Sequence, residues 1–347
     1  MEKKEKIVRA EGRITLKHVA EDAGVSRSTV SLVLRGGTNL ADETVQRVIG
    51  SIQKLGYVYN RAAASLRTNR SNTVGLLVPN IQNPVFAEIL VGAEEKLNRI
   101  GMTLLLTNTG ESLDRQKRAL TLMHEHGVEG ILICPVRGTK GRDIAPLLAG
   151  TPTVFLTRYL DDFPCNYIGI DNSGGIAAAM DHLFNLGHRR IAFAGGYADT
   201  SSFRDRSEAV LTALRERGLP AETGLLFPSN ISTEGGEEMV NGLLAVKERP
   251  SAIVCFNDLV ALGLMIGLKR HGLQPGRDIS VIGFDDMPIS SALNPALTTV
   301  RAETIAIGHS AAELLESLIE EGEAAPRRII LPTTLVVRES TWSCRKD

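Results

Sequence analysis

The sequence predicts an all-α head followed by an α/β core of two lobes, each built on a doubly wound parallel sheet. Two observations carry this prediction. Three short amphipathic segments follow one another within residues 14–59. From residue 73 onward, short apolar runs alternate with longer segments of helical periodicity, and the alternation repeats after residue 172. Two such series predict two lobes that face each other across a cleft.

The head is expected to begin where a charged extension, residues 1–13, ends. Thr15 can cap a first helix that stops at Gly24. Ser26 can cap a second helix through Leu34, and a third is predicted over residues 42–55. In the second helix the apolar side is Val30, Val33 and Leu34, so the outward side is expected to be Arg27, Ser28, Ser31 and Leu32.

A short hinge is predicted between the head and the core, over residues 60–72. Asn60 can cap a two-turn helix from Arg61 to Arg67, in which Leu66 is the prominent apolar residue. So short a helix is unstable alone, and we expect it to become ordered only when something holds it. The alternative is a plain linker.

The predicted strands of the core are continuous apolar runs such as "TVGLLVP", which is typical of parallel strands covered on both faces. Ligands bind at the carboxyl ends of such strands. The residues at those ends are polar or small: Pro79, Asn80, Asn108, Thr157, Arg158, Gly195, Gly196, Asn257, Asp258, Asp285 and Asp286.

Charge is distributed unevenly along the chain. Lys and Arg number 39 and Asp and Glu 40, yet residues 1–70 hold 13 basic and 7 acidic residues. A basic head on an acidic body suggests a polyanion-binding module, although a solubilising tail would give the same balance. No run of about 18 apolar residues and no apolar leader is present, so we expect a cytoplasmic protein without a membrane span.

Signatures of catalysis are missing from the sequence. It has no GxSxG elbow, P-loop or HExxH motif. Cys134, Cys165, Cys255 and Cys344 stand singly, which favours reduced thiols over a metal site. His182, His188 and His271 are expected at the surface or at helix ends. A binding cleft therefore fits better than an enzyme, and no cofactor or metal is expected.

Several motifs, in order, resemble the lactose/galactose repressor family of bacterial transcription regulators. The most specific are "TLKHVAEDAGVSRSTVSLVL" and "TVQRVIGSIQKLGYVYNRAAASLR". "LGHRRIAFAGG", "NDLVALG", "DISVIGFDD", "NPALTTVR" and "PTTLVVRES" add matches through the core. The resemblance runs from Ile14 to Trp342.

The resemblance implies a helix-turn-helix head over 14–59, a hinge helix, and a core like that of periplasmic sugar-binding proteins. It also implies a homodimer, sometimes a dimer of dimers; the short C-terminus without a leucine heptad favours the dimer. Three crossings between lobes are implied. They place the N-lobe at about 73–171 and 300–330, the C-lobe at about 172–299 and 331–342, and a tail at 343–347.

For operator DNA, the resemblance makes Arg27 and Ser28 the leading base readers, with Ser31 and Leu32 one turn later. Arg27 could instead contact a phosphate. Leu32 departs from lactose-repressor-like members, which carry a guanine-reading arginine there. The resemblance also implies that Leu66 wedges between base pairs from the minor groove, as a leucine at this position does in the family. Further DNA-contact candidates are Ser26, Thr29, Asn39, Asn60 and Arg61.

For the effector, the family's sugar- and purine-binding positions correspond to Phe86, Arg206, Asn257 and Asp285. Each has a structural alternative: Phe86 as core, Asn257 as a helix cap, and Asp285 as an ion-pair partner of Arg206. Thr157 departs from an aspartate that is common in relatives. Arg158 lies beside Thr157, so the cleft would hold two arginines, Arg158 and Arg206, and one acidic residue fewer than in those relatives. This balance favours an anionic effector such as a sugar acid or sugar phosphate.

The sequence thus predicts a DNA-binding transcriptional repressor whose operator affinity is controlled by a sugar or sugar derivative. Whether that effector is an inducer or a co-repressor stays open. The alternative, a solute-binding protein of sugar uptake, shares the core but would have a signal peptide and no DNA-binding head.

Overall fold

The structure is a computed structural model that describes residues 14–34, 40–58, 70–221, 225–322 and 325–344. Internal contacts divide the chain into two units, Met1–Ser71 and Asn72–Asp347, and each is described by itself. None of the described helices is long and apolar enough to cross a membrane.

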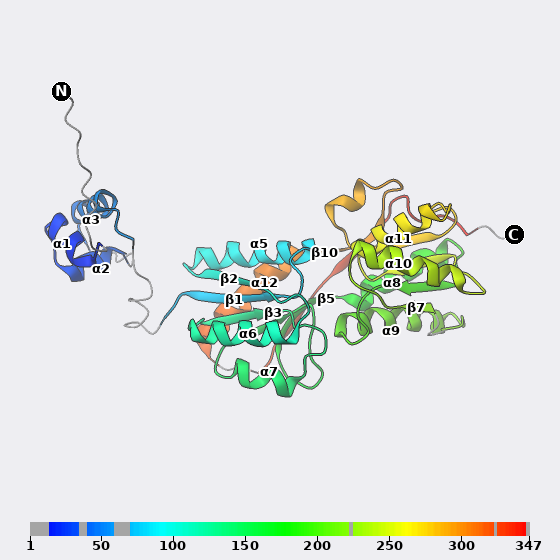
Figure 1. Ribbon diagram of the computed structural model, residues 1–347, viewed down its shortest axis with the longest axis horizontal. Coiled ribbons are helices and arrows are strands. Elements are labelled where there is room, and N and C mark those ends of the chain that lie inside the picture. The colour runs from blue at the N-terminus through cyan, green and yellow to red at the C-terminus, as the bar shows by residue number, and fades with distance from the viewer. Residues whose placement is uncertain (1–13, 35–39, 59–69, 222–224, 323–324, 345–347) are drawn as a thin grey trace, which may run out of the picture. The chain divides into compact units, whose positions relative to one another are not determined.

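The first unit contains three helices, α1 (Leu16–Ala23), α2 (Arg27–Leu34) and α3 (Asp42–Leu55) (Figure 1). Their bounds are those that the sequence predicted. Gly24 and Gly56 end α1 and α3 with φ values of +66° and +63°, a conformation that glycine adopts without steric cost. The apolar sides of the helices meet in one small core around Val19, Val30 and Val48.

The N-lobe carries a six-stranded sheet in the order β11-β5-β4-β3-β1-β2, and all its strands are parallel. Helices α5 and α12 pack on one face of the sheet, and α6 and α7 on the other (Figure 1). The elements are β1 (Thr73–Val78), α5 (Pro84–Arg99), β2 (Thr103–Asn108), α6 (Leu113–Glu125), β3 (Gly130–Ile133), α7 (Gly141–Leu148), β4 (Thr153–Leu156), β5 (Asn166–Ile170), α12 (Thr304–Glu321) and β11 (Arg328–Leu331).

The C-lobe repeats this plan with the strand order β12-β10-β9-β8-β6-β7. Only β12 runs antiparallel to its neighbour. Helices α8 and α9 pack together, as do α10 and α11. The elements are α8 (Asn172–Asn185), β6 (Ile191–Ala194), α9 (Ser201–Glu216), β7 (Leu226–Phe227), α10 (Thr233–Ala245), β8 (Ala252–Cys255), α11 (Asp258–Arg270), β9 (Ser280–Asp285), the 3-10 helix η2 (Pro288–Ser291), β10 (Thr298–Ala302) and β12 (Thr333–Val336).

The chain crosses between the lobes three times, after β5, after β10 and after β11. The second crossing differs from the expected boundary at residue 300. Residues 300–302 belong to β10, whose backbone pairs with β9 and β12 of the C-lobe. Leu331 likewise ends β11 in the N-lobe sheet. The boundaries between the lobes depend on which strands pair and in which register, and sequence motifs do not predict that pairing.

Close helix packing in the N-lobe depends on two glycines. A Cβ atom at Gly92 of α5 would lie 2.1 Å from the carbonyl oxygen of Ile305 in α12. A Cβ atom at Gly308 of α12 would lie 2.2 Å from the carbonyl oxygen of Ile89 in α5. Reciprocal glycines therefore let α12, which follows the second crossing, lie directly against α5 beside the cleft.

Candidate functional site

The outer surface of α2 begins with a cluster of hydroxyl groups. The Oγ atom of Ser26 accepts a hydrogen bond from the amide of Thr29 at 3.1 Å, which caps the helix. The same Oγ lies 2.6 Å from Ser28 Oγ and 2.9 Å from Thr29 Oγ1. Ser26, Arg27 and Ser28 are exposed. This end of α2 can therefore present hydroxyl groups, a guanidinium and free backbone amides to a polyanion.

One residue of the expected outward side lies elsewhere. Ser31 is 4% exposed and belongs to the interior of the unit, so its expected outward orientation was wrong. Successive residues of a helix are about 100° apart, and the small side chain next to buried Val30 is covered when α1 and α3 close around α2. Leu32 is half-buried and keeps a partly open position.

Four DNA-contact candidates, Asn39, Asn60, Arg61 and Leu66, lie outside the described residues. The proposed hinge roles of the last three remain expectations.

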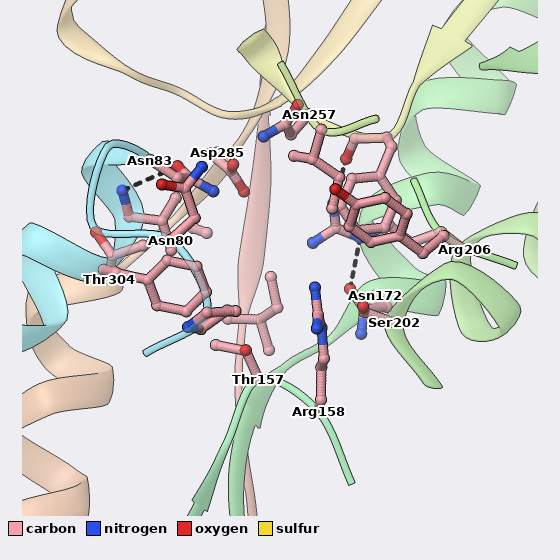
Figure 2. A pocket seen from close by; sticks show the side chains of 18 of the residues that line it. Asn80, Asn83, Thr157, Arg158, Asn172, Ser202, Arg206, Asn257, Asp285 and Thr304 are labelled. Carbon is pink, nitrogen blue, oxygen red and sulfur yellow. Dashed lines mark hydrogen bonds between the residues drawn. The ribbon is translucent and has the colours of Figure 1, made fainter. Parts of the chain in front are cut away.

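The core contains a cavity of about 250 Å³ between the two lobes. Its wall includes all five predicted effector residues, Phe86, Arg158, Arg206, Asn257 and Asp285 (Figure 2). Asn257 and Asp285 lie at one end in this view, and Thr157 and Arg158 at the other. Several further wall residues did not figure among the predicted site residues: Asn80, Asn83, Glu111, Asn172, Tyr197, Ser202, Phe256 and Thr304.

Arg206 is fixed in the cavity wall by polar and aromatic contacts. It is 6% exposed, and its Nε donates to Asn172 Oδ1 at 2.8 Å. Its Nη1 donates to the carbonyl oxygen of Phe256. The guanidinium carbon lies 3.7 Å from the ring centroid of Phe284 and 4.7 Å from that of Phe256. Burial lowers the pKa of Arg206 although nearby Asp285 raises it.

Asn257 divides its two polar atoms between two tasks. Its Oδ1 accepts from the amide of Val260 at 3.1 Å and caps α11, as the structural alternative predicted. The residue is 1% exposed, and its Nδ2 is the one buried side-chain nitrogen or oxygen of the described residues without a hydrogen-bond partner. An unpaired buried donor is costly, so this nitrogen is suited to bind an effector oxygen.

Asp285 stands at the end of β9 in an unusual backbone conformation. Its φ is +109° and that of Asp286 is +58°, both positive at non-glycine residues. Asp286 accepts from Arg301 at 2.8 Å and Arg338 at 2.6 Å, which holds the turn in place. Burial raises the pKa of Asp285 to about 8, and Arg206 counteracts this only in part.

Arg206 and Asp285 do not form the alternative structural ion pair. They are close enough to affect each other's pKa, but the ion pairs shorter than 4.0 Å in the described chain do not include them. The Asp285 carboxyl group therefore lines the cavity without an ion-pair partner at that distance, and neighbouring Asn257 lowers its pKa.

Arg158 is not the uncompensated cation that the expectation of an anionic effector requires, because Glu111 pairs with it. Arg158 donates from Nη2 to Glu111 Oε1 at 2.8 Å and from Nη1 to Glu111 Oε2 at 3.1 Å. Its Nη1 also reaches the carbonyl oxygen of Pro135 at 3.2 Å. A bidentate carboxylate neutralises this guanidinium. Glu111 comes three residues after β2, so its role depends on a loop that the sequence leaves unplaced.

Phe86 has both of the roles considered for it, because it is 6% exposed within the main hydrophobic core and also lines the cavity. The residues that sequence reasoning missed share one location, the carboxyl edges of the two sheets. Asn80 was already among the residues expected at strand ends. Glu111 and Phe256 follow strands, and Asn172 and Ser202 begin helices. Extending the strand-end rule to the whole following loop and first helical turn would have found them.

Other reactive side chains are structural. His188 was expected at the surface or at a helix end, but it is 3% exposed and bonds Ser251 Oγ at 2.8 Å and the Trp342 carbonyl oxygen at 3.0 Å. Cys134 and Cys255 are buried, and all four cysteines are free thiols. No group of His, Cys, Asp or Glu among the described residues is placed to hold a metal ion.

Two family models match the chain. Residues 15–60 match the model "Bacterial regulatory proteins, lacI family", and residues 180–341 match "Periplasmic binding protein-like domain". The chain is 33% identical over 332 residues to the HTH-type transcriptional repressor PurR of Mannheimia succiniciproducens, covering 94% of this chain and 98% of the relative. It is 31% identical over 329 residues to the repressor of the same name in Photobacterium profundum, with the same coverage.

Solved structures agree with this assignment. The lac repressor dimer bound to operator and the anti-inducer ONPF superposes with a TM-score of 0.85 at 26% identity, covering 95% of this chain and all of that one. A complex of the transcriptional regulator CelR with cellobiose gives 0.72 at 29%, covering 94% and 100%. A LacI family regulator from Enterococcus faecium with bound ribose gives 0.70 at 26%, covering 79% and 100%.

The helical head, the two-lobed core and the full-length similarity to named repressors agree, and none of them points to an enzyme. The chain belongs to the LacI family of bacterial DNA-binding transcriptional repressors.

Proposed function

We propose that this repressor binds its operator as a homodimer and that a small polyhydroxylated effector, a sugar or sugar derivative, binds in the cavity and changes operator affinity. The unpartnered Nδ2 of Asn257, in the same cavity wall as Asp285 and Arg206, carries this proposal. The cytoplasm is the compartment in which such a protein meets its DNA.

The chemistry of this end of the cavity supports an effector with neighbouring hydroxyl groups. A hydroxyl group both donates and accepts hydrogen bonds. It can therefore accept from Asn257 Nδ2 and from the Arg206 guanidinium while it donates to Asp285. A purely apolar ligand would leave Nδ2 unsatisfied, at a cost of about 1–3 kcal/mol.

The size of the cavity and the other residues of its wall further limit the chemical class of the effector. About 250 Å³ is at the small end of ligand pockets, which suits a ligand with a single sugar ring. Phe86 supplies apolar surface for a ring face. At the Arg158 end the charge is already balanced by Glu111, which favours an uncharged group there. Arg206 has no carboxylate within ion-pairing distance in the described chain, so a sugar acid would place its charge at that end.

Two LacI-family structures support the sugar class, since one contains cellobiose and another ribose. For the DNA side, the exposed start of α2 supports Arg27 and Ser28 as base readers, with Ser26 and Thr29 near the phosphates. Leu32 then contributes apolar contact. We retain the minor-groove role for Leu66.

A matched substitution tests the effector site. Serine caps helices as well as asparagine does, so Asn257→Ser should preserve the cap of α11 while it removes Nδ2 from the cavity wall. In thermal-shift screens of neutral sugars, sugar acids and sugar phosphates, we expect wild type to be stabilised by one class. Asn257→Ser should unfold near the wild-type temperature without ligand but bind that ligand about 5–150-fold more weakly.

The control is Ser112→Asn, which exchanges a cap residue on α6 outside the cavity wall. It should leave the ligand-induced shift unchanged. If Asn257→Ser binds the ligand as tightly as wild type does, the assignment of Nδ2 to the effector is wrong.

A further inference from the structure

The segment that follows β4, residues 157–161, leads from the cavity to the C-lobe. Thr157 has a φ of +58°, which is strained for a β-branched residue. The Arg158 amide bonds to the Leu156 carbonyl oxygen at 2.5 Å, and the Thr157 amide bonds to the Ile168 carbonyl oxygen at 2.9 Å. This tight turn sends the Arg158 side chain into the cavity, where Figure 2 shows it, and directs the next residue away from it.

That next residue, Tyr159, bonds across the cleft at both its ends. Its amide donates to Ser201 Oγ at 2.9 Å, and its hydroxyl donates to Asp205 Oδ1 at 2.8 Å. Both partners are on α9 of the C-lobe. On the N-lobe side the ring is held edge-to-face by Tyr167 at 5.3 Å and stacked by the Arg328 guanidinium at 4.2 Å. A rigid N-lobe side chain is thus anchored to the C-lobe.

A second contact lies beside the first. Arg204 of α9 donates from Nη1 to Asp161 Oδ2 at 2.6 Å and from Nη2 to Asp161 Oδ1 at 3.0 Å. Its Nη2 also donates to the Tyr159 hydroxyl at 3.2 Å, which joins the two contacts into one network. The bidentate geometry fixes the orientation of α9 against the N-lobe segment as well as its distance.

The same two segments also form part of the cavity wall. On α9, Ser202 and Arg206 line the cavity while Arg204 and Asp205 reach the N-lobe. On the N-lobe segment, Arg158 lines the cavity while its neighbour Tyr159 reaches α9. A shift of α9 relative to this segment would therefore move Arg206 relative to Arg158.

We propose that Tyr159, Asp161, Arg204 and Asp205 form a cross-lobe clamp, a set of positioning residues that holds Arg158 and Arg206 at their separation across the effector cavity. The proposal rests on the proposed function only in taking the cavity as the effector site. Exposed ion pairs add little to overall stability. The clamp should therefore control opening of the cleft rather than unfolding of the protein.

Hydrogen exchange of the full-length protein, without effector or DNA, tests the clamp. The variant carries Tyr159→Phe and Asp161→Asn, which keep the shapes of both side chains. The first removes the hydroxyl bonds to Asp205 and Arg204, and the second removes the charge of the Arg204–Asp161 ion pair. The bond from the Tyr159 amide to Ser201 stays in place. We expect amides of residues 157–163 and 198–204 to exchange about fivefold faster or more, because each opening of the cleft exposes them. The temperature of thermal unfolding should change little.

The matched control is Asp181→Asn, which breaks an exposed pair of the same type, Arg217 to Asp181 at 2.7 Å, within the C-lobe alone. It should leave exchange at residues 157–163 unchanged. Three results would overturn the proposal. These are unchanged exchange in the clamp variant, an equal effect in the control, and uniformly faster exchange in both lobes. Since no effector is used, failure of the clamp leaves the effector assignment standing, and failure to find an effector leaves the clamp testable.

Discussion

At the residue scale, the character of the cavity depends on how single side chains divide their polar atoms. Asn257 uses its oxygen to cap α11 and keeps its nitrogen for the cavity. Arg158 uses its guanidinium on Glu111, whereas Arg206 is held by neutral groups and aromatic rings. Two arginines that look equivalent in the sequence therefore differ in the charge that they offer a ligand.

Asp285 should make the stability of the effector-free protein depend on pH. In the unfolded chain its carboxyl group ionises near pH 4, while burial holds the folded-state pKa at about 8. The folded state therefore keeps a proton that the unfolded state has lost, and this contribution to stability disappears as pH rises through 8. Relative to Asp285→Asn, wild type should lose roughly 2 kcal/mol of unfolding free energy between pH 6 and 8.

Chemical denaturation of wild type and Asp285→Asn at several pH values between 6 and 9 measures this difference. Parallel stability curves for the two proteins would show that Asp285 is already ionised at neutral pH.

At the element scale, each helix of the first unit is delimited by residues with a local physical role. The cap at Ser26 starts α2, and left-handed glycines end α1 and α3. Such features depend only on neighbouring residues, which is why the bounds agree with prediction. The α2 cap also places Arg27 and Ser28 in the first turn, where base readers are expected.

Removal of this cap should loosen α2 without disrupting its core contacts. Ser26→Ala deletes the acceptor for the Thr29 amide and should cost about 1 kcal/mol of local stability, or roughly fivefold faster exchange of the α2 amides. Ser28→Ala is the control, since the Ser28 hydroxyl bonds to the Ser26 hydroxyl and does not cap a backbone amide in the described part of the chain. Equal exchange rates in the two variants would remove the capping role.

At the scale of the whole molecule, one edge of the N-lobe is unusually apolar. The edge strand β2 exposes Leu105 and Leu106 at 39% and 37%, and Val91 of α5 is 44% exposed. An apolar edge strand with open backbone groups invites pairing or packing with another chain. This surface supports the proposal that the repressor acts as a homodimer, with a second copy covering β2.

Leu106→Asp should weaken this dimer by at least about tenfold, because association would bury an unpaired carboxylate. Sedimentation over a range of protein concentrations measures the change. Ile330→Asp is a suitable control, since Ile330 is 44% exposed on β11, the opposite edge strand of the same sheet. Equal effects of the two substitutions would place the interface elsewhere.

The sequence by itself determined the three helices of the head, the alternation of strands and helices in most of the core, the split between head and core, and five residues of the cavity wall. Apolar periodicity, caps and glycine stops are local signals, and family motifs mark the positions of Phe86, Arg206, Asn257 and Asp285. Each of these signals involves residues that are close in sequence, so it does not depend on how the rest of the chain folds.

Only the tertiary structure decided what those residues can offer a ligand. Glu111 and Arg158 are 47 positions apart, and their pairing changed the charge of the cavity. Ser31 became buried because two other helices close over it, and β10 joined the C-lobe through its register. The same holds for the contact of Tyr159 with α9. Burial, charge pairing and strand register depend on residues brought together from distant parts of the chain, so no local pattern encodes them.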